Sequence, residues 1–295
     1  MVNAAGVARI RRRLLGLLLV THPIPSAMYV VAVGLFSALA ADASHRSLSL
    51  SRLVLVLAGV ACAQMAIGST NDYRDRDLDR VSRPEKPIVR GLISSRDALM
   101  LALFATGGVL AFMAPLGVLP FILGICVEGL GLAYDLGLKG TVFSAFLYAV
   151  YFPLIPLLAW AVFGKWQPFL PWLLPVGALL GVAMNVANSL PDVEQDRLAG
   201  VSGLPHMLGP RWALAVAWGL PLVALALLWA LDGIGVVPSR LPSLVAASAI
   251  GLAASAGAAG LYVWKPSPAT LRKTFIVQAL GVVGLATGWL AAVAF

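Results

Sequence analysis

The sequence has little charge, and negative charge in particular is scarce. Only 12% of its 295 residues are charged and only 13 are acidic, whereas a soluble domain carries about 25% charged residues. The hydrophobic fraction is 60% and the mean hydropathy is +0.91. These values exclude an ordinary soluble domain and a disordered chain, and they predict a polytopic integral membrane protein.

Cysteine and histidine are also rare. Cys62 and Cys126 both lie inside apolar segments, where cysteine usually packs as a small apolar residue. We therefore expect neither a disulfide nor a redox role for them. His22, His45 and His206 are far apart in the sequence and have no cysteine or histidine cluster beside them. The sequence therefore predicts no zinc site.

The apolar segments are long enough for nine membrane spans of about 20 residues each. No ten-residue segments of alternating polarity occur, so we expect helices rather than membrane strands. We place the spans at residues 18–40, 52–71, 97–115, 117–135, 142–163, 169–190, 211–231, 242–264 and 274–294. Spans and loops use up the whole chain, so we expect a single transmembrane domain over residues 1–295.

The 21 lysines and arginines are distributed unevenly between the two sides of these spans. Arg46, Arg52, Lys165 and Arg240 fall on one side, and all the others fall on the side of the N-terminus. Basic residues concentrate on the cytoplasmic side, so we expect the N-terminus inside and the C-terminus outside, in a bacterial cell membrane. The net charge of +8 then reflects topology and contact with anionic lipid, and no nucleic-acid partner is expected.

The basic N-terminus has some features of a signal peptide. Arg9 to Arg13 precede the short apolar stretch 14–20, but Pro23 and Pro25 interrupt it and a further apolar run follows directly. This pattern favours an uncleaved first span with a basic cytoplasmic flank.

The few acidic residues are concentrated in two stretches, each at the end of an apolar segment. Residues 72–97 and 192–196 contain 9 of the 13 acids. Asp72, Asp75 and Asp79 are three and four residues apart, which places them on one face of a helix. Asn71, four residues before Asp75, widens this face. Asp77 falls elsewhere, and we expect it in water or paired with a neighbouring arginine, Arg74 or Arg80.

The second stretch has the same helical spacing. Asp192 and Asp196 are four residues apart, and Asn188 and Asn185 extend the row backwards in steps of four and three. Pro191 lacks a backbone donor, so it is expected to kink the helix. Glu194 lies off this face.

Carboxylates gathered in this way repel one another unless cations lie among them. Mg²⁺ suits such a site, because it binds one or two carboxylates and completes its shell with water and substrate phosphates. The first stretch is surrounded by Arg74, Arg76, Arg80, Arg83, Lys86 and Arg90. These cations indicate an anionic ligand, and a diphosphate fits both features.

Glu128 lies inside the fourth span, and Asp135 follows seven residues later on the same face. An intramembrane carboxylate normally faces the interior and has a partner. Two interpretations stay open for this face, a structural hydrogen bond and a role in a substrate cavity.

The segment Asn71-Asp72-x-x-Asp75-x-x-x-Asp79 resembles the first signature of the UbiA superfamily of intramembrane prenyltransferases. The following Arg83-Pro84-Glu85-Lys86-Pro87-Ile88 resembles the family's Arg-Pro-x-Arg-Pro-Ile segment, with Lys86 replacing the second arginine. Asp192-x-x-x-Asp196 resembles the second signature, and Leu204-Pro205 and Leu208-Gly209 match a pattern just after it. In order and spacing the resemblance covers nearly the whole chain.

The resemblance implies a bundle of nine helices around a central cavity, with a prenyl diphosphate held by Mg²⁺ between the two motifs. It assigns the metal to Asn71, Asp72, Asp75, Asp79, Asp192 and Asp196. Together with the surrounding charges, it assigns the substrate to Asn71, Arg76, Arg83, Lys86, Tyr134, Lys139 and Asn188. The expected catalytic residues are Asp72, Asp75, Arg76, Lys139 and Asp192.

The expected reaction begins with ionisation of an allylic carbon–oxygen bond. Mg²⁺, Arg76 and Lys139 would stabilise the charge on the departing diphosphate, and an apolar cavity would keep water from the allylic cation. Cation–π contact could shelter this cation, with Tyr134, Phe143, Phe146, Tyr148 and Tyr151 as candidates. We expect an aromatic or other lipid- or quinone-precursor acceptor to attack the cation.

Two alternatives stay open from the sequence. A terpene cyclase on the same scaffold would form product without an acceptor, because the substrate's own double bonds would attack the cation. A membrane transporter would have interrupted, polar helices near the middle of the bilayer. Here the polar residues gather at one membrane face, which favours an enzyme.

Overall fold

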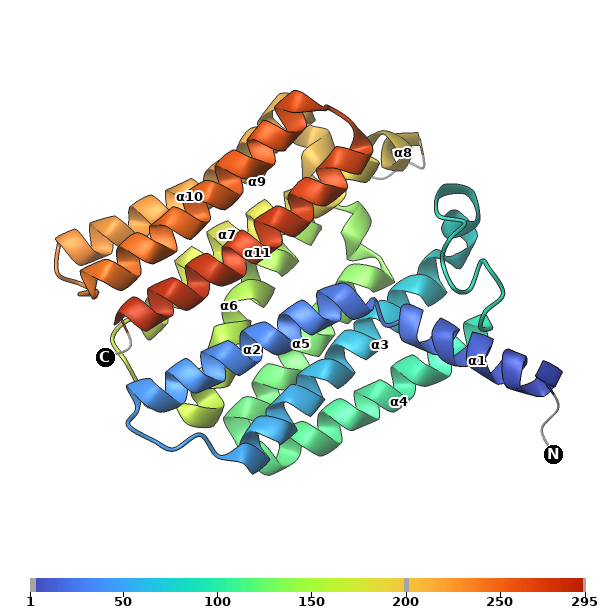
Figure 1. The fold of residues 1–295 in the computed structure, drawn as a ribbon, viewed down its shortest axis with the longest axis horizontal. Helices are drawn as coiled ribbons and strands as arrows, with labels where there is room; N and C mark the ends of the chain where they lie inside the picture. Colours follow the sequence, from blue (N-terminus) through green and yellow to red (C-terminus); the bar gives the residue numbers. More distant parts are fainter. Residues whose placement is uncertain (1–3, 199–201, 294–295) are drawn as a thin grey trace. The chain divides into compact units, whose positions relative to one another are not determined.

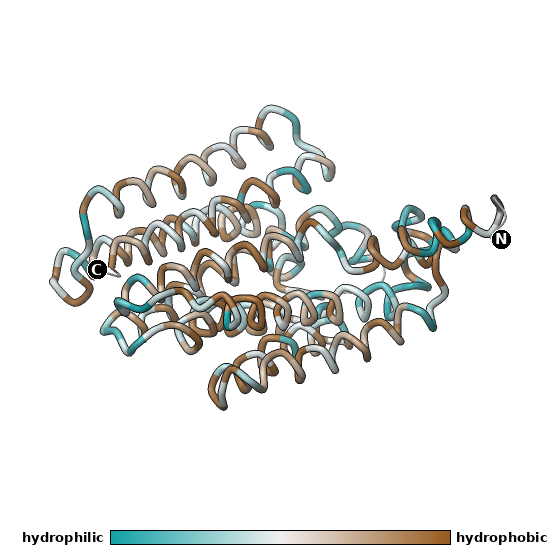
Figure 2. The backbone as a smooth tube through the Cα atoms, turned by 60° about the horizontal axis from the view of Figure 1, so that its bottom comes forward, coloured by the Kyte–Doolittle hydropathy of each residue, from teal (hydrophilic) through white to brown (hydrophobic). Residues whose placement is uncertain are grey.

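The computed structural model describes residues 4–198 and 202–293, and these residues form α-helices joined by short turns (Figure 1). Within those two ranges nine helices are long and apolar enough to cross a membrane, and no strand occurs. Figure 2 shows apolar residues along these helices and polar ones concentrated at the loops. The prediction of an all-helical protein with nine spans is confirmed.

The helices are α1 (Ala4–Leu19), α2 (Pro23–Ala43), α3 (Leu50–Ser82), α4 (Ser95–Met113), α5 (Val118–Leu136), α6 (Phe143–Phe163), α7 (Leu173–Ser189), α8 (Val193–Leu198), α9 (Leu204–Gly233), α10 (Leu241–Trp264) and α11 (Pro268–Val293). The 3-10 turns are η1 (Ala114–Leu116), η2 (Leu138–Gly140), η3 (Leu170–Trp172) and η4 (Leu190–Asp192).

Several helix boundaries differ from the prediction, and three of them concern the segments around the acidic motifs and the basic flank. The predicted first span began at residue 18, but the chain breaks at His22, whose φ is +50°, and α2 begins at Pro23. Proline suits the first turn of a helix, where its missing N–H is not needed. The basic flank is therefore a separate helix, α1. Helix α3 continues to Ser82 instead of ending at residue 71, and α9 begins at Leu204 with a kink at Gly209.

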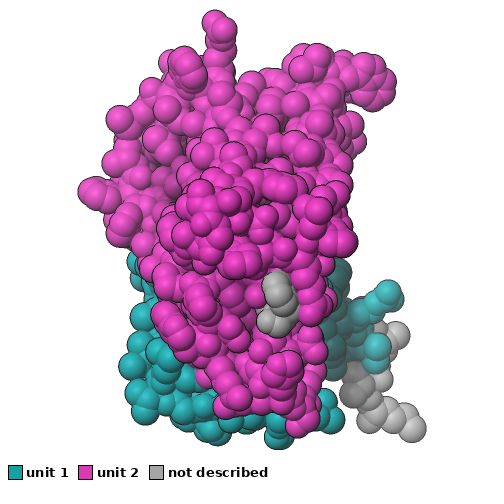
Figure 3. Space-filling model, turned by 90° about the vertical axis from the view of Figure 1, so that its left-hand side faces the viewer, with its two compact units in different colours: residues 1–34, 49–137 teal, residues 35–48, 138–295 magenta. Residues whose placement is uncertain are grey.

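The chain divides into two compact units, which Figure 3 shows in different colours. Unit 1 consists of Met1–Gly34 and Ser49–Gly137, and unit 2 consists of Leu35–Leu48 and Leu138–Phe295. The first acidic stretch belongs to unit 1 and the second to unit 2, so each has its own supporting helices.

In unit 1, α3 packs against α4 and α5. The side chain of Met113 fills the space between them, since a Cβ atom on Gly59 of α3 or on Gly124 of α5 would come within 3.0 Å of it. A capping box starts α4, in which Ser94 and Asp97 exchange hydrogen bonds with each other's backbone N–H groups. These contacts fix the helix that carries the first acidic row.

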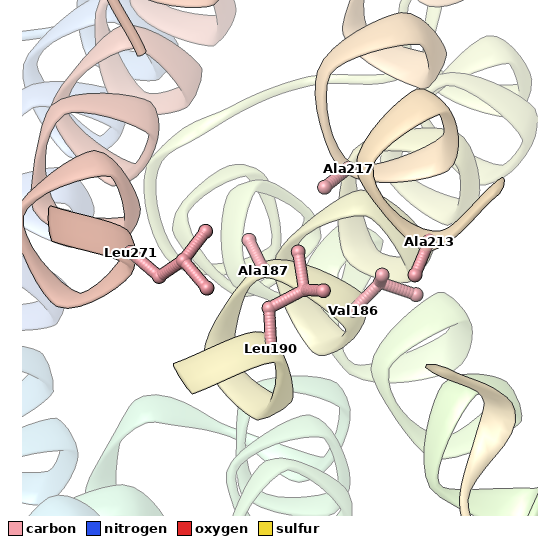
Figure 4. Packing of buried hydrophobic residues seen from close by; sticks show 6 residues of the cluster. All are labelled: Val186, Ala187, Leu190, Ala213, Ala217 and Leu271. Carbon is pink, nitrogen blue, oxygen red and sulfur yellow. The ribbon is translucent and has the colours of Figure 1, made fainter. Parts of the chain in front are cut away.

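In unit 2, α6 and α7 approach closely at Gly181. A Cβ atom there would lie 2.2 Å from the carbonyl oxygen of Tyr148. Beyond this contact, α7 packs against α9 and α11. Figure 4 shows the buried cluster at the end of α7, in which Leu271 of α11 lies beside Ala187 and Leu190.

We predict that Gly181→Ala destabilises unit 2, because the added carbon meets a backbone atom that cannot move alone. Overpacking of this kind costs about 1–3 kcal/mol, so thermal unfolding of the detergent-solubilised protein should shift to lower temperature. Gly257→Ala in α10 is the matched control, because no atom lies within 4 Å of the added carbon. Equal unfolding temperatures for the two variants would contradict the close approach.

Candidate functional site

The first acidic row lies on the last turns of α3, which continues unbroken from its apolar part. The N–H of Arg83 ends the helix by donating to the carbonyl oxygen of Asp79, at 2.8 Å. Asp72 and Asp79 are buried and Asp75 is half-buried. The helix assumed in the spacing argument is therefore present.

Asp72 is the most enclosed member of the row, with 1% of its side chain exposed. Nε2 of His22, at the corner between α1 and α2, lies 2.8 Å from its Oδ1 atom. A carboxylate oxygen only accepts, so the proton of this bond lies on the histidine. Nζ of Lys86 also donates to Oδ1 of Asp72 and lies 3.3 Å from Oδ1 of Asn71. Two basic side chains thus hold one oxygen of this carboxylate.

Lys86 reaches the row because the chain turns back after α3. The N–H of Lys86 donates to the carbonyl oxygen of Arg83 at 3.1 Å, and the N–H of Arg90 donates to that of Lys86 at 3.0 Å. Gly91 allows the turn with a φ of +64°, and Ile93 then packs with Val20 and Ala98. The segment predicted to bind substrate is therefore folded back onto α3.

A residue of α5 holds the side chain of Asn71 in place. Its Nδ2 atom donates to Oδ1 of the buried Asp135 at 2.8 Å. Seven residues earlier, Glu128 accepts a hydrogen bond from Oγ1 of Thr106 at 2.6 Å. The structure thus favours a structural bond for Glu128, whereas Asp135 orients a residue predicted to bind metal.

Arg76 lies four residues after Asp72 and three before Asp79, on the face of α3 that carries the buried row, whereas Asp77 lies off this face. The Arg76 guanidinium donates to the carbonyl oxygen of Tyr73 at 2.7 Å and lies 5.0 Å from the centre of the Tyr73 ring. Asp77 is exposed and accepts from Arg80 at 2.9 Å, as the spacing predicted.

The second motif lies where α7 passes into a 3-10 turn that contains Pro191, and the φ and ψ angles of Leu190 and Val193 stay helical there. Helix α7 ends at Ser189, η4 carries Asp192, and α8 carries Asp196. Asp192 is buried, and its Oδ1 atom accepts from Nη2 of Arg272 at 2.8 Å. The neighbouring Leu271 packs on the end of α7 (Figure 4), so the start of α11 brings Arg272 to the motif.

The remaining residues of this region have varied surroundings. Asn188 and Asp196 are half-buried, and the fully buried Asn185 accepts from Oγ of Ser144 at 3.3 Å. Glu194 accepts from Arg197 at 2.7 Å on the exposed side, and this bond raises the pKa of the Arg197 guanidinium. Glu194 thus lies off the row, as predicted.

Tyr134 lies near the end of α5 and Lys139 in η2, and both are half-buried. The aromatic candidates of α6 divide into two groups. Phe143 and Phe146 are more than half exposed, whereas Tyr151 is buried and Tyr148 is half-buried and stacked on Phe152, with ring centres 5.8 Å apart. Among the candidates of α6, the two tyrosines therefore suit the role of sheltering a cation better than the two phenylalanines.

Sequence reasoning missed two residues that hold the acidic motifs. His22 was set aside as an isolated histidine, and Arg272 was counted only as a topology charge. They lie 50 and 80 residues from the aspartates that they contact. Local spacing carries no signal for pairs so distant in the chain.

The donor set of the first row fits a divalent cation. Oδ2 of Asp72 and Oδ2 of Asp79 are buried and make no hydrogen bond within the part of the chain that the structure describes, which is costly without a cation. Among residues 4–198 and 202–293, no three His, Cys, Asp or Glu side chains are grouped closely enough to hold a metal. Carboxylate oxygens are ligands that Mg²⁺ takes, one or two at a time, and water and phosphate oxygens fill the rest of its shell.

The fold and these motifs are those of an intramembrane transferase. Residues 27–282 match the model of the UbiA prenyltransferase family. The chain therefore belongs to this family and is a prenyltransferase of the membrane, as the motifs predicted. This result favours an enzyme over the transporter considered from the sequence.

The chain is similar to digeranylgeranylglyceryl phosphate synthases of archaea. It is 32% identical to that of Methanopyrus kandleri over 218 residues, 70% of this chain and 77% of the relative. It is 35% identical to that of Thermococcus gammatolerans over 193 residues, 62% of this chain and 67% of the relative.

Two solved structures show the same fold. A UbiA homolog from Archaeoglobus fulgidus bound to GPP and Mg²⁺ has a TM-score of 0.70 and 20% identity, and the match covers 92% of this chain and 99% of that one. The apo structure of a UbiA homolog from Aeropyrum pernix has a TM-score of 0.69 and 19% identity, with 88% and 96% covered.

We predict that Lys86→Gln destabilises the metal-free protein, because the buried Asp72 carboxylate loses its nearest cation. Breaking a buried ion pair on one side costs roughly 3 kcal/mol, so the unfolding temperature should fall. Added Mg²⁺ should restore part of the loss, since binding to the folded state stabilises it. Arg272→Gln is the comparison, and its half-exposed pair should cost less than about 1 kcal/mol. This account would be contradicted if Lys86→Gln had the unfolding temperature of the wild type, or if added Mg²⁺ did not raise the unfolding temperature of the variant.

Proposed function

We propose that the protein transfers a prenyl group from a prenyl diphosphate to a lipid-soluble acceptor with the help of Mg²⁺. The observation that carries this proposal is the pair of buried Oδ2 atoms, on Asp72 and Asp79, that make no hydrogen bond in the described parts of the chain. The structures of homologs bound to GPP or DMAPP with Mg²⁺ support a donor of this class.

The metal ligands in this proposal are Asn71, Asp72, Asp75, Asp79, Asp192 and Asp196. When bound, Mg²⁺ supplies positive charge at the leaving diphosphate, where negative charge develops. The chain's own residues orient these ligands. His22 and Lys86 hold one oxygen of Asp72, Asp135 holds Asn71, and Arg272 holds Asp192. A ligand that is fixed before the reaction needs no reorganisation during it.

The cations of the site are proposed to bind the diphosphate. Arg76 can leave the Tyr73 carbonyl by rotating its side chain, of which 36% is exposed. Lys86 has three donors on its ammonium group, so it can bind a phosphate oxygen in addition to Asp72. Arg83, Lys139, Tyr134 and Asn188 complete the proposed substrate contacts. Charge-assisted bonds of this kind to a departing phosphate strengthen as its charge grows.

The chemistry of the prenyl group determines which surroundings its reacting carbon needs. Ionisation leaves an allylic cation that water would destroy, so the reacting carbon has to stay in apolar surroundings. Tyr148 and Tyr151 of α6 are the aromatic side chains best suited to stabilise it, because their ring faces can attract a cation. The acceptor then donates an electron pair to this carbon and loses a proton.

Two acceptor classes follow from different observations. The sequence predicted an aromatic or other lipid- or quinone-precursor acceptor. The relatives are named as synthases of digeranylgeranylglyceryl phosphate, a name that indicates an alcohol of a glyceryl phosphate lipid as acceptor. We favour the glyceryl phosphate class, because the identity reaches 35%.

We also infer that both motifs face the cytoplasm, with the N-terminus inside and the C-terminus outside. The distribution of lysine and arginine supports this orientation. Labelling of an Asp77→Cys variant by an impermeant reagent from outside intact cells would contradict it.

We predict that Asp72→Ala and Asp192→Ala each lower diphosphate release by at least about a hundredfold, because each removes charge stabilisation of the leaving group. Removal of divalent metal with a chelator should have the same effect. Asp77→Ala is the matched control, since this carboxylate is exposed and pairs with Arg76 and Arg80 of its own helix. Full activity of either Asp variant, or activity without metal, would exclude the proposed mechanism.

We predict that product forms only when an acceptor is present. The purified enzyme would receive prenyl diphosphates of several lengths, with a prenylglyceryl phosphate, with candidate phenols, or with no acceptor. Prenylation of the glyceryl phosphate would support the acceptor class that we favour, and prenylation of a phenol would support the aromatic class instead. A cyclic hydrocarbon formed without acceptor would identify a cyclase.

A further inference from the structure

We propose that α1 is a membrane-surface helix that binds anionic lipid headgroups and thereby holds the α1–α2 corner that supports Asp72. The second part of this proposal, the effect on Asp72, rests on the proposed function. The first part, the binding of lipid, does not. The occupant to which we commit is the anionic surface of a phospholipid bilayer.

One side of α1 carries four exposed apolar side chains, and Arg11, four residues after Val7 and three before Leu14, lies on the same side. Val7, Ile10, Leu14 and Leu18 are 55%, 54%, 61% and 57% exposed. They follow one another in steps of three, four and four, so they form a single stripe along the helix. A stripe of this size facing water would be unfavourable, and it indicates contact with a second apolar phase.

The opposite side of α1 is attached to unit 1. Gly16 lies two residues from both Leu14 and Leu18, on the far side of the helix. A Cβ atom on Gly16 would be 2.7 Å from Ile93 and 2.9 Å from Leu92. Arg13 forms an ion pair with Asp97 at the start of α4. Helix α1 therefore cannot rotate to bury its apolar stripe against the rest of its unit.

The charge of α1 selects the kind of bilayer. The helix contains Arg9, Arg11, Arg12 and Arg13 and no acidic residue, and Arg9, Arg11 and Arg12 are exposed. A guanidinium binds phosphate through two parallel hydrogen bonds. An amphipathic helix with arginines beside its apolar stripe lies in the headgroup region and favours anionic lipids. The spanning helix α2 begins four residues after α1 ends, which keeps α1 at the membrane edge.

The end of α1 is joined to the candidate site. Nε2 of His22 holds Oδ1 of Asp72 at 2.8 Å. The corner also rests directly on α3, since a Cβ atom on Gly68 would lie 2.9 Å from the backbone of Thr21. Movement of α1 away from the bilayer would therefore pull on the corner and on His22, which we regard as a positioning residue for Asp72.

The test of lipid binding uses the full-length protein in two kinds of nanodisc, phosphatidylcholine alone and phosphatidylcholine mixed with phosphatidylglycerol. Hydrogen exchange of residues 4–19 should be several-fold slower in the mixed nanodisc. The Arg9→Gln/Arg11→Gln/Arg12→Gln variant, which leaves the Arg13–Asp97 pair intact, should lose this difference.

The matched control is Arg96→Gln/Arg211→Gln/Lys265→Gln, which removes the same charge from exposed positions outside α1. It should keep the difference between the two nanodiscs. Exchange of α1 that is equal in both lipids, or a difference that the control loses to the same extent, would overturn the proposal of lipid binding.

The test of the coupling compares prenyl transfer in the same nanodiscs. Phosphatidylglycerol should increase the rate several-fold in the wild type and should leave the triple arginine variant unchanged. His22→Ala should keep the lipid-dependent exchange of α1 but lose the lipid dependence of the rate. If phosphatidylglycerol slows the hydrogen exchange of α1 but does not change the rate of prenyl transfer, the link between α1 and Asp72 is wrong and lipid binding still stands. Absence of transfer in every membrane would overturn the proposed function, while hydrogen exchange would still decide on lipid binding.

Discussion

Asp72 keeps a carboxylate out of water, with only 1% of its side chain exposed, and burying such a charge is costly unless its partners compensate. Its two partners come from different places, His22 from the corner before α2 and Lys86 from the turn after α3. Their positions require the close contacts of Gly16 and Gly68, and the fold of the segment 83–94. Much of unit 1 near the site is thus arranged around one negative charge.

The second motif also contains a buried aspartate, but its local backbone differs from that of the first motif. Asp192 is also buried and also paired, with Arg272 from the first turns of α11. Here, however, the 3-10 turn η4 joins α7 to α8, so Asp192 lies in the turn and Asp196 lies on α8. The aspartates of the first motif share one continuous helix. The two motifs therefore resemble each other in sequence more than in local structure.

The sequence was sufficient where the signal is local. Apolar length predicted the nine spans, and the spacing of Asp72, Asp75 and Asp79 predicted a helix. The residues that hold the motifs were not predicted, because His22 and Arg272 reach the aspartates only through tertiary packing. The end of α3 was misplaced for a related reason. Charged residues end an apolar segment, but they do not by themselves end a helix.

Helix α3 is 33 residues long, which corresponds to about 50 Å, whereas the hydrocarbon core of a bilayer is about 30 Å thick. A helix that crosses this core therefore has several turns to spare, and the acidic row occupies its last turns. An amphiphile with a charged head and an apolar tail already has its head at the height of those turns while it is dissolved in the bilayer. Such a substrate could diffuse in the plane of the membrane to the enzyme and would not have to be lifted out of the lipid.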